Sequence, residues 1–462
     1  MWRDSSAPLA KQHHMGSESI FRLVLSMSVP IMFSLLVQAM YNIVDSICIS
    51  AYSEHGLAAL TIAFPLQVFL TAVGNGVGTG TGILISRALG AGKRDSTVNL
   101  AENGLAAALM GWALTALLLL SGLSFYYQCV SRTQQVIAMG VVYGRIVISA
   151  SLFLMVESVC TRIIQANGNT VWPMLYQALG AVLNIVLDPL LIFGFGPIPA
   201  MGVPGAALAT VLGQLTAMCC ALWMVIGKLN CKRLRFQLPI QRDIWRMGLP
   251  TLLTSALVSA YITGLEGVLA RFSEYAVTSL GIYYKIQTFL LLPSYGLEQG
   301  TLPILGFNLS AKNQARVWQT FKLSLLISEF SLLAGTAAVN WFLPSILTLF
   351  SAGPELRATA EPALRIISMA FPLFCPTILI PTLLQAAGRL KQSSAVVILR
   401  QVVLLVPLAI FLSRWGLLYT WLTFPISEAV SALFCAGLLW QYARQERRTA
   451  PPEAAFQAET PG

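Results

Sequence analysis

The sequence predicts an all-α protein that crosses a membrane about twelve times and is built from two similar halves. Hydrophobic residues make up 56% of the 462 residues and charged residues only 10%, with a mean hydropathy of +0.71. Soluble domains carry about 25% charged residues, so the composition is that of a polytopic membrane protein. A second observation, a repeat at one fixed offset, divides the chain into halves.

The apolar runs set the number of spans. A helix crosses the hydrocarbon core of a bilayer with about 20 apolar residues, and the chain holds about twelve such runs, which leaves no room for a sizeable soluble domain. The expected spans are residues 23–50, 57–86, 98–122, 136–164, 171–195, 203–227, 246–270, 277–305, 318–343, 360–386, 393–413 and 416–441.

An internal repeat appears when the chain is shifted by 220 residues. Met27–Pro30 then falls on Met247–Pro250, and Gln165–Gly168 falls on Gln385–Gly388. Each copy has an even number of spans, so both insert with the same orientation and are related by a pseudo-two-fold axis along the membrane normal. Transporters built in this way bind substrate between the halves and rock them about it.

The repeat and the polar stretches divide the chain into five parts. The expected parts are an N-terminal cytoplasmic segment (1–20), an N-lobe of six spans (21–228), a cytoplasmic linker (229–244), a C-lobe of six spans (245–442) and a disordered cytoplasmic tail (443–462).

The positive charges indicate the orientation of the chain. The net charge is +10, but the basic residues gather in alternate connections rather than in one patch, which argues against nucleic-acid binding. Loops rich in Lys and Arg stay in the cytoplasm, so both termini and the central loop are expected there. The basic residues that support this are Lys11, Arg22, Arg87, Lys93, Arg94, Lys228, Lys232, Arg233, Arg235, Arg242, Arg246, Lys312, Arg316, Lys322, Arg389, Lys391, Arg444, Arg447 and Arg448.

The fifth span carries a carboxylate near its middle. A charged group there costs at least a few kcal/mol, so such residues usually face a polar cavity or a partner. Asn184 lies four residues before Asp188, on the same helical face. Pro189 leaves one carbonyl of the preceding turn without its helical donor. The segment predicts either a small-cation site or a buried Asp satisfied by neighbouring helices.

The first span carries a polar stripe. Gln38, Tyr41, Asn42 and Asp45 follow one another at helical spacing, and Pro30, two turns earlier, allows a bend. Asp45 and Asp188 place two acids in one lobe, where close approach favours the uptake of a proton by one of them.

A bare Na⁺ is the alternative coupling ion. Asp45, Asn184, Asp188 and Thr210 supply oxygen atoms, the ligands that a hard cation prefers. Interhelical hydrogen bonding without any ion is the structural alternative.

The second lobe lacks these acids. The shift places Leu265 at the position of Asp45 and Leu408 at that of Asp188. Glu266, with Lys285 and Glu298 of the next span, could bind a cationic substrate, with mutual neutralisation as the alternative. The further candidates for the substrate cleft are Gln38, Tyr41, Asn42 and Glu157.

Several motifs resemble those of the multidrug and toxic compound extrusion (MATE) family, closest to its bacterial drug and sodium antiporter branch. The resemblance covers roughly residues 20–440. It rests on Pro30 with Gln38–Asp45, on Gln165–Asn169, on Asn184–Pro189, on Gly205–Thr210, and on Lys285, Pro293, Gly300 and Pro303–Asn308.

The resemblance implies a V of two six-helix bundles in a bacterial inner membrane. It implies export of cationic lipophilic compounds in exchange for H⁺ or Na⁺, with no enzymatic activity and no cofactor. The family's cation site carries over onto Asp45, Asn184, Asp188 and Thr210. Two departures are Gln165, where the family often has Arg, and a tenth span without Asp. We expect a monomer whose partners are small-molecule substrates and membrane lipids.

Other functions remain open at this stage. A flippase for lipid-linked sugars of the same superfamily favours a wide cationic cleft, whereas the central helices here carry mostly acids and amides. A metabolite is an alternative cargo. A membrane-embedded prenyl transferase needs a DDxxD-like acid pair, which the sequence lacks. A channel is disfavoured by the asymmetric acids.

Overall fold

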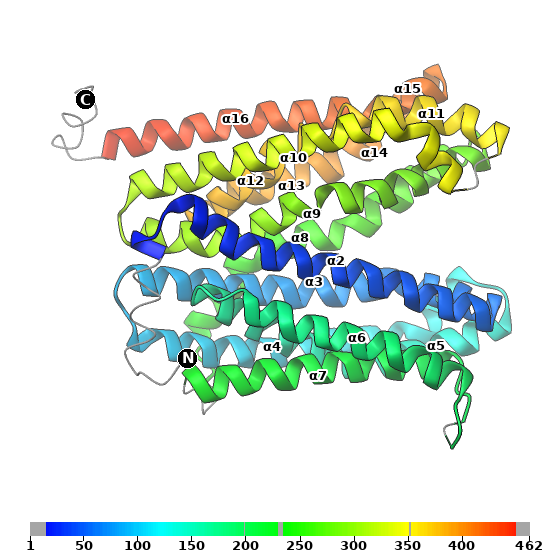
Figure 1. Ribbon diagram of the computed structural model, residues 1–462, viewed down its shortest axis with the longest axis horizontal. Coiled ribbons are helices and arrows are strands. Elements are labelled where there is room, and N and C mark those ends of the chain that lie inside the picture. Colours follow the sequence, from blue (N-terminus) through cyan, green and yellow to red (C-terminus); the bar gives the residue numbers. More distant parts are fainter. Residues whose placement is uncertain (1–14, 198, 230–233, 351–352, 450–462) are drawn as a thin grey trace.

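The chain folds into two bundles of long helices that lie side by side along their lengths (Figure 1). The structure is a computed structural model, and it describes residues 15–197, 199–229, 234–350 and 353–449. The first bundle, the N-lobe, contains α2 (Ile20–Tyr52), α3 (Glu54–Gly90), α4 (Asp95–Val130), α5 (Gln134–Ala166), α6 (Val171–Phe193) and α7 (Val203–Leu229).

The second bundle, the C-lobe, is more interrupted. It contains α8 (Leu238–Leu269), α9 (Glu274–Ser310), α10 (Gln314–Leu349), α11 (Pro354–Ser368), α12 (Phe374–Ala386), α13 (Leu390–Ile398), the π-helix η1 (Leu399–Leu404), α14 (Leu405–Leu412), the 3-10 turn η2 (Ser413–Trp415), α15 (Leu417–Trp421) and α16 (Thr423–Thr449).

The prediction of about twelve spans in two lobes is confirmed. Among the described residues, ten helical stretches are long and apolar enough to cross a membrane. The other two expected spans correspond to α9, which contains Pro293 and Pro303, and to α11 with α12, which a turn at 369–373 separates.

The boundary between linker and C-lobe differs from the prediction. The sequence places the linker at 229–244, but α8 begins at Leu238. The start of the helix is held against α4, because the amide N–H of Gln237 donates to Asn103 Oδ1 at 2.8 Å and Gln241 Nε2 donates to the Asn103 carbonyl at 2.8 Å. Pro239 in the first turn also favours a helix start.

At the C-terminal end, too, the helical part of the chain is longer than the sequence predicts. The sequence predicts a disordered tail from residue 443, but α16 continues to Thr449, and only 450–462 lie outside the described residues. Tyr442, just before this extension, is 1% exposed; it packs beside Trp318, and the Arg389 guanidinium lies 4.8 Å from its ring centroid. These contacts hold the last turns of α16 against the C-lobe.

The two lobes meet through small residues. α3 packs against α8 and α9, and α2 packs against α9. A Cβ added to Gly248 would meet the carbonyl oxygen of Gly76, and one added to Gly80 would meet that of Ile244. Glycine at these positions lets the helix backbones approach closely.

Polar contacts between the lobes gather at the same end of the molecule. Arg87, near the end of α3, donates from Nε and Nη2 to the Ala386 carbonyl at 3.1 and 2.5 Å. Arg316 Nη2 donates to the Glu18 carbonyl at 2.8 Å. The lobes are therefore joined firmly at the end where α3 finishes and α8 begins.

Candidate functional site

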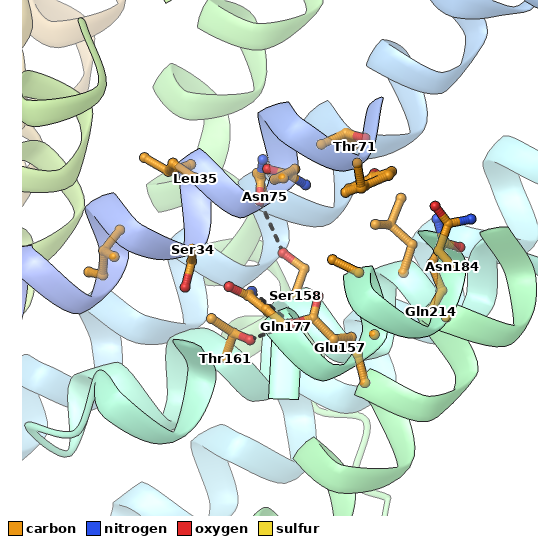
Figure 2. Close-up of a pocket in the computed structure, with 18 of the residues that line it drawn as sticks. Ser34, Leu35, Thr71, Asn75, Glu157, Ser158, Thr161, Gln177, Asn184 and Gln214 are labelled. Carbon is orange, nitrogen blue, oxygen red and sulfur yellow. Dashed lines mark hydrogen bonds between the residues drawn. The ribbon is translucent and has the colours of Figure 1, made fainter. Parts of the chain in front are cut away.

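A polar cavity of about 170 Å³ lies inside the N-lobe (Figure 2). Six helices contribute to its lining: Gln38 comes from α2, Asn75 from α3, Glu157 from α5, Asn184 from α6, Thr210 from α7 and Gln299 from α9 of the C-lobe. Pockets for drug-sized ligands usually have volumes of about 300–1,000 Å³. This cavity therefore suits ions and water better than an organic cargo.

Glu157 is buried at the wall of this cavity with its hydrogen bonds satisfied. Its Oε1 accepts from Thr161 Oγ1 at 2.7 Å and from Gln177 Nε2 at 2.9 Å, and Figure 2 shows the three side chains together. Thr161 in turn lies 2.6 Å from the Tyr176 hydroxyl. The sequence-predicted candidate is thus placed at a cavity, but in the N-lobe and within a fixed network.

Asn184 and Asp188 occupy consecutive turns of α6. Asn184 Nδ2 donates to Asp188 Oδ1 at 3.3 Å, and Asp188 has no exposed surface. Asp45 on the adjacent α2 is near enough to Asp188 for the two carboxyls to interact electrostatically. The structure therefore brings three of the four predicted cation-site residues into one region, although neither acid is among the residues that line the cavity.

Three oxygen atoms in this region lack a hydrogen-bond donor. Asp45 Oδ1, Asn184 Oδ1 and Asp188 Oδ2 are buried, and none has a partner within the described part of the chain. Leaving such groups unsatisfied costs about 1–3 kcal/mol each, and more for a charged group. A proton or a Na⁺ ion would satisfy them, so the donor set fits either coupling ion. Thr210 lines the adjoining cavity, and its hydroxyl supplies a fourth oxygen from α7.

The polar stripe of α2 is divided between two cavities. Gln38 and Tyr41 line the N-lobe cavity, whereas Gln38 and Asn42 line a second one. With 3.6 residues per turn, Tyr41 projects about 60° to one side of Gln38 and Asn42 about 40° to the other. α2 runs unbroken through Pro30, which leaves the predicted bend a prediction.

The second cavity, of about 560 Å³, lies between the lobes. We call it the central cavity. Its walls come from α2 and α3 of the N-lobe and from α8, α9, α12, α13 and η1 of the C-lobe. The volume falls within the range of drug-sized pockets. Among the described residues that line it, Glu298 and Arg400 are the ones that carry a charge.

Glu266 and Lys285 are not brought to these cavities. Both side chains are exposed, and neither residue is among those lining the N-lobe or the central cavity. The Lys285 ammonium lies 5.4 Å from the centroid of the Phe350 ring. Their predicted role in the substrate cleft therefore finds no geometric support.

The sequence analysis missed a buried ion pair in the C-lobe. Arg400 Nε donates to Glu428 Oε1 at 2.6 Å, with the two side chains 17% and 3% exposed. The signal was available, because each residue stands alone in an apolar span and charged residues in such places mark functional sites. The repeat drew attention to acids absent from the C-lobe instead.

Comparison with known proteins places the chain among transporters. It is similar to the FAD transporter of Shewanella oneidensis, with 25% identity over 436 residues that cover 92% of this chain and 95% of that protein. It is similar to the multidrug export protein MepA of Staphylococcus aureus, with 25% identity over 449 residues that cover 95% and 97%.

The fold is also that of a solved transporter. A structure described as the outward-facing conformation of a multidrug resistance MATE family transporter of the MOP superfamily superposes with a TM-score of 0.87 at 23% identity, covering 95% of this chain and 98% of that chain. The MatE family model matches residues 30–190 and again residues 250–411. The family resemblance is thus confirmed, and the chain belongs to the MatE family of membrane transporters.

Proposed function

We propose that the protein is a secondary active antiporter that exports cationic lipophilic compounds in exchange for H⁺ or Na⁺. The observation that carries the proposal is the set of three buried oxygens, on Asp45, Asn184 and Asp188, that have no donor among the residues the structure describes. They form a site that is incomplete until a cation enters. The MepA relative, named as a multidrug export protein, supports drug efflux as the activity.

The two cavities bind different ligands in this proposal. The N-lobe cavity, at about 170 Å³, admits the coupling ion, and the central cavity, at about 560 Å³, receives the cargo. Gln38 lines both of them. Binding of the ion at α2 and α6 changes the packing of α2, and α2 is part of the cargo wall. Coupling of this kind requires that ion and cargo favour different states.

The internal repeat supports alternating access. The two segments that match the family model begin 220 residues apart, at 30 and 250, which is the offset found in the sequence. Halves related in this way move as rigid bodies about a central site. If the basic loops are cytoplasmic, the end joined by Arg87 and Ala386 faces the cytoplasm, and the structure corresponds to a state closed on that side.

The same argument supports an inner-membrane protein with both termini in the cytoplasm and the linker between the lobes on the same side. The basic residues of the connections are the evidence for this orientation. We propose that the unit of transport is the monomer, because both cavities are formed within one chain.

Purified protein in liposomes tests the proposal. Vesicles are given either an imposed pH gradient or a Na⁺ gradient, and the movement of ethidium is followed by fluorescence. Transport driven by one gradient and abolished when that gradient is collapsed is expected. Ethidium movement that responds to neither gradient would overturn the antiport mechanism.

A metabolite is the second candidate cargo. The relative from Shewanella oneidensis is named as an FAD transporter, and the central cavity of this chain contains Arg400, a cation that a purely cationic cargo would not require. Efflux of flavins alongside ethidium in the same vesicles separates the two cargo classes.

A further inference from the structure

The C-lobe wall of the central cavity carries an arginine whose donors have no protein partner. Arg400 Nε is occupied by Glu428, but within the described part of the chain its two Nη atoms have no hydrogen-bond partner. Arg400 lines the central cavity. A guanidinium presents donors in a planar fork that matches a carboxylate or a phosphate.

Glu428 positions this arginine, and both of its carboxylate oxygens already accept a hydrogen bond. Its Oε1 accepts from Arg400 Nε, its Oε2 accepts from Thr377 Oγ1 at 3.0 Å, and the residue is 2% exposed. The guanidinium also lies against the Phe374 ring, 4.6 Å from its centroid. Glu428 and the Phe374 ring therefore hold the arginine in place, while its Nη atoms keep no hydrogen-bond partner among the described residues.

Two neighbouring polar atoms are buried and without a partner. Gln401 Oε1 and the Tyr284 hydroxyl both belong to residues that line the central cavity, and neither has a hydrogen-bond partner in the described structure. Gln401 is 7% exposed. Arg400 and Gln401 are consecutive residues of the π-helix η1. Short π-helical segments inside α-helices occur frequently at functional sites.

Aromatic rings surround this group. Tyr261 and Tyr284 line the cavity with ring centroids 6.5 Å apart, and Tyr295 lines it as well. A smaller recess of about 20 Å³ lies against Arg400, Gln401 and Tyr284. Its volume is close to that of one water-sized site, so it can take a small polar group but not a ring system.

From this arrangement we propose that Arg400 and Tyr284 form a binding subsite for the acidic end of a planar aromatic cargo, bearing a carboxylate or a phosphate. The acidic group accepts from the Arg400 Nη atoms and from the Tyr284 hydroxyl. The ring system lies in the central cavity against Tyr261 and Tyr295. The proposal rests on the antiporter function proposed above and deepens its second candidate, the metabolite cargo, by naming the chemical class of that cargo.

The second charge in the cavity does not reverse this preference. Glu298 interacts electrostatically with Arg162 of the N-lobe as well as with Arg400. Its charge is therefore offset from the N-lobe side. Arg400 and Tyr284, which both line the cavity, keep donors without a partner in the described structure, and these donors call for an acceptor.

Binding of one fluorophore with four different end groups tests the subsite. The probes are 9-anthracenecarboxylate, 9-anthracenylmethyl phosphate, 9-anthracenemethanol and 9-anthracenemethylamine, titrated against the purified protein in detergent without any gradient. We expect at least one of the two acids to bind about tenfold or more tightly than the alcohol and the amine. The acid that binds more tightly identifies the source of the acidic group.

The variants remove the fork while keeping the buried charge balanced. Replacing Arg400 alone would leave the buried Glu428 carboxylate without its counter-ion, which is strongly destabilising. The test variant is therefore the double substitution Arg400→Gln with Glu428→Gln. It should bring the acids to the affinity of the alcohol, whose binding should change less than about twofold. Arg400→Lys keeps the charge but not the fork and should lose part of the preference, as should Tyr284→Phe.

Arg145→Gln, which removes an exposed arginine outside the lining of both cavities, is the charge-matched control. An acid preference that is undiminished in the double variant, or undiminished in both Arg400→Lys and Tyr284→Phe if the double variant does not fold, would overturn the proposal. So would tightest binding of the amine to the wild-type protein. The measurement needs no gradient, so its failure is distinguishable from a failure of antiport.

Discussion

Asn184 donates one hydrogen bond to Asp188 across a single turn of α6, and each side chain keeps one buried oxygen to which no group in the described structure donates. Asp45 on α2 adds a third such oxygen rather than a donor. Where α2 and α6 meet, buried acceptor oxygens therefore lack a donor or cation in the described structure, and a coupling ion can supply one.

The substitution Asp188→Asn should uncouple transport. It removes a charge while keeping the shape of the side chain, and it supplies an amide donor to the region that lacks one. Gradient-driven efflux of ethidium from liposomes is expected to fall at least tenfold, with the amount of folded protein unchanged. Asp95→Asn, at the exposed start of α4, is the matched control and should transport normally. Full efflux by the Asp188 variant would contradict the assigned role.

Sodium should stabilise the protein if it is the coupling ion. A ligand that binds only the folded state at about 100 times its dissociation constant adds about 2.7 kcal/mol to the free energy of unfolding. We expect the melting temperature in NaCl to exceed that in an equal concentration of choline chloride. Asp45→Asn should remove this difference in melting temperature, because it takes away the negative charge and one carboxylate oxygen of the proposed Na⁺ site. Equal melting temperatures of the wild-type protein in the two salts would assign the coupling to H⁺.

The packing of the lobes predicts a strong effect of a single methyl group. In Gly248→Ala the new Cβ would meet the Gly76 carbonyl, a backbone atom that cannot rotate away. Overpacking of this kind typically costs about 1–3 kcal/mol, and here it would act on the closed interface between α3 and α8. We expect the transport rate to fall several-fold and cysteine labels placed on the α3 and α8 ends to become more accessible.

Gly122→Ala is the matched control for this prediction, because a Cβ at Gly122 in α4 has no atom within 4 Å. It should leave both transport and label accessibility unchanged. Equal behaviour of the two alanine variants would mean that the α3–α8 contact does not hold the lobes together.

Much of this architecture follows from the sequence because the membrane imposes it. Spans must be about 20 apolar residues long, and so their number and their lobes could be predicted. The intramembrane acids Asp45 and Asp188 stood out for the same reason, since a charge in a bilayer needs a partner. Their proximity is a consequence of α2 packing against α6.

The cavities could not be predicted in the same way. A rotation of α2 about its own axis by a few tens of degrees would change which of its side chains face which cavity. In the structure Tyr41 lines the N-lobe cavity and Asn42 lines the central cavity. Arg400 and Glu428 are 28 residues apart and pair only through the packing of η1 against α16. Helix ends beyond the bilayer, such as the start of α8, are set by contacts with Asn103 rather than by hydropathy.

The contact at Asn103 leads to the last prediction. Asn103 Oδ1 accepts the Gln237 amide, and its carbonyl accepts Gln241 Nε2, so one buried asparagine of α4 holds the beginning of α8. Asn103→Leu removes the side-chain acceptor of the part-buried Gln237 amide, a hydrogen bond that contributes about 0.5–1.5 kcal/mol. The first turns of α8 should then open more often. Trypsin cleavage after Arg235 should be faster by several-fold in the variant, as measured by the appearance of two half-length fragments. An unchanged cleavage rate would show that the start of α8 is held by its other contacts, of which the 2.9 Å ion pair between Arg235 and Glu102 is the nearest.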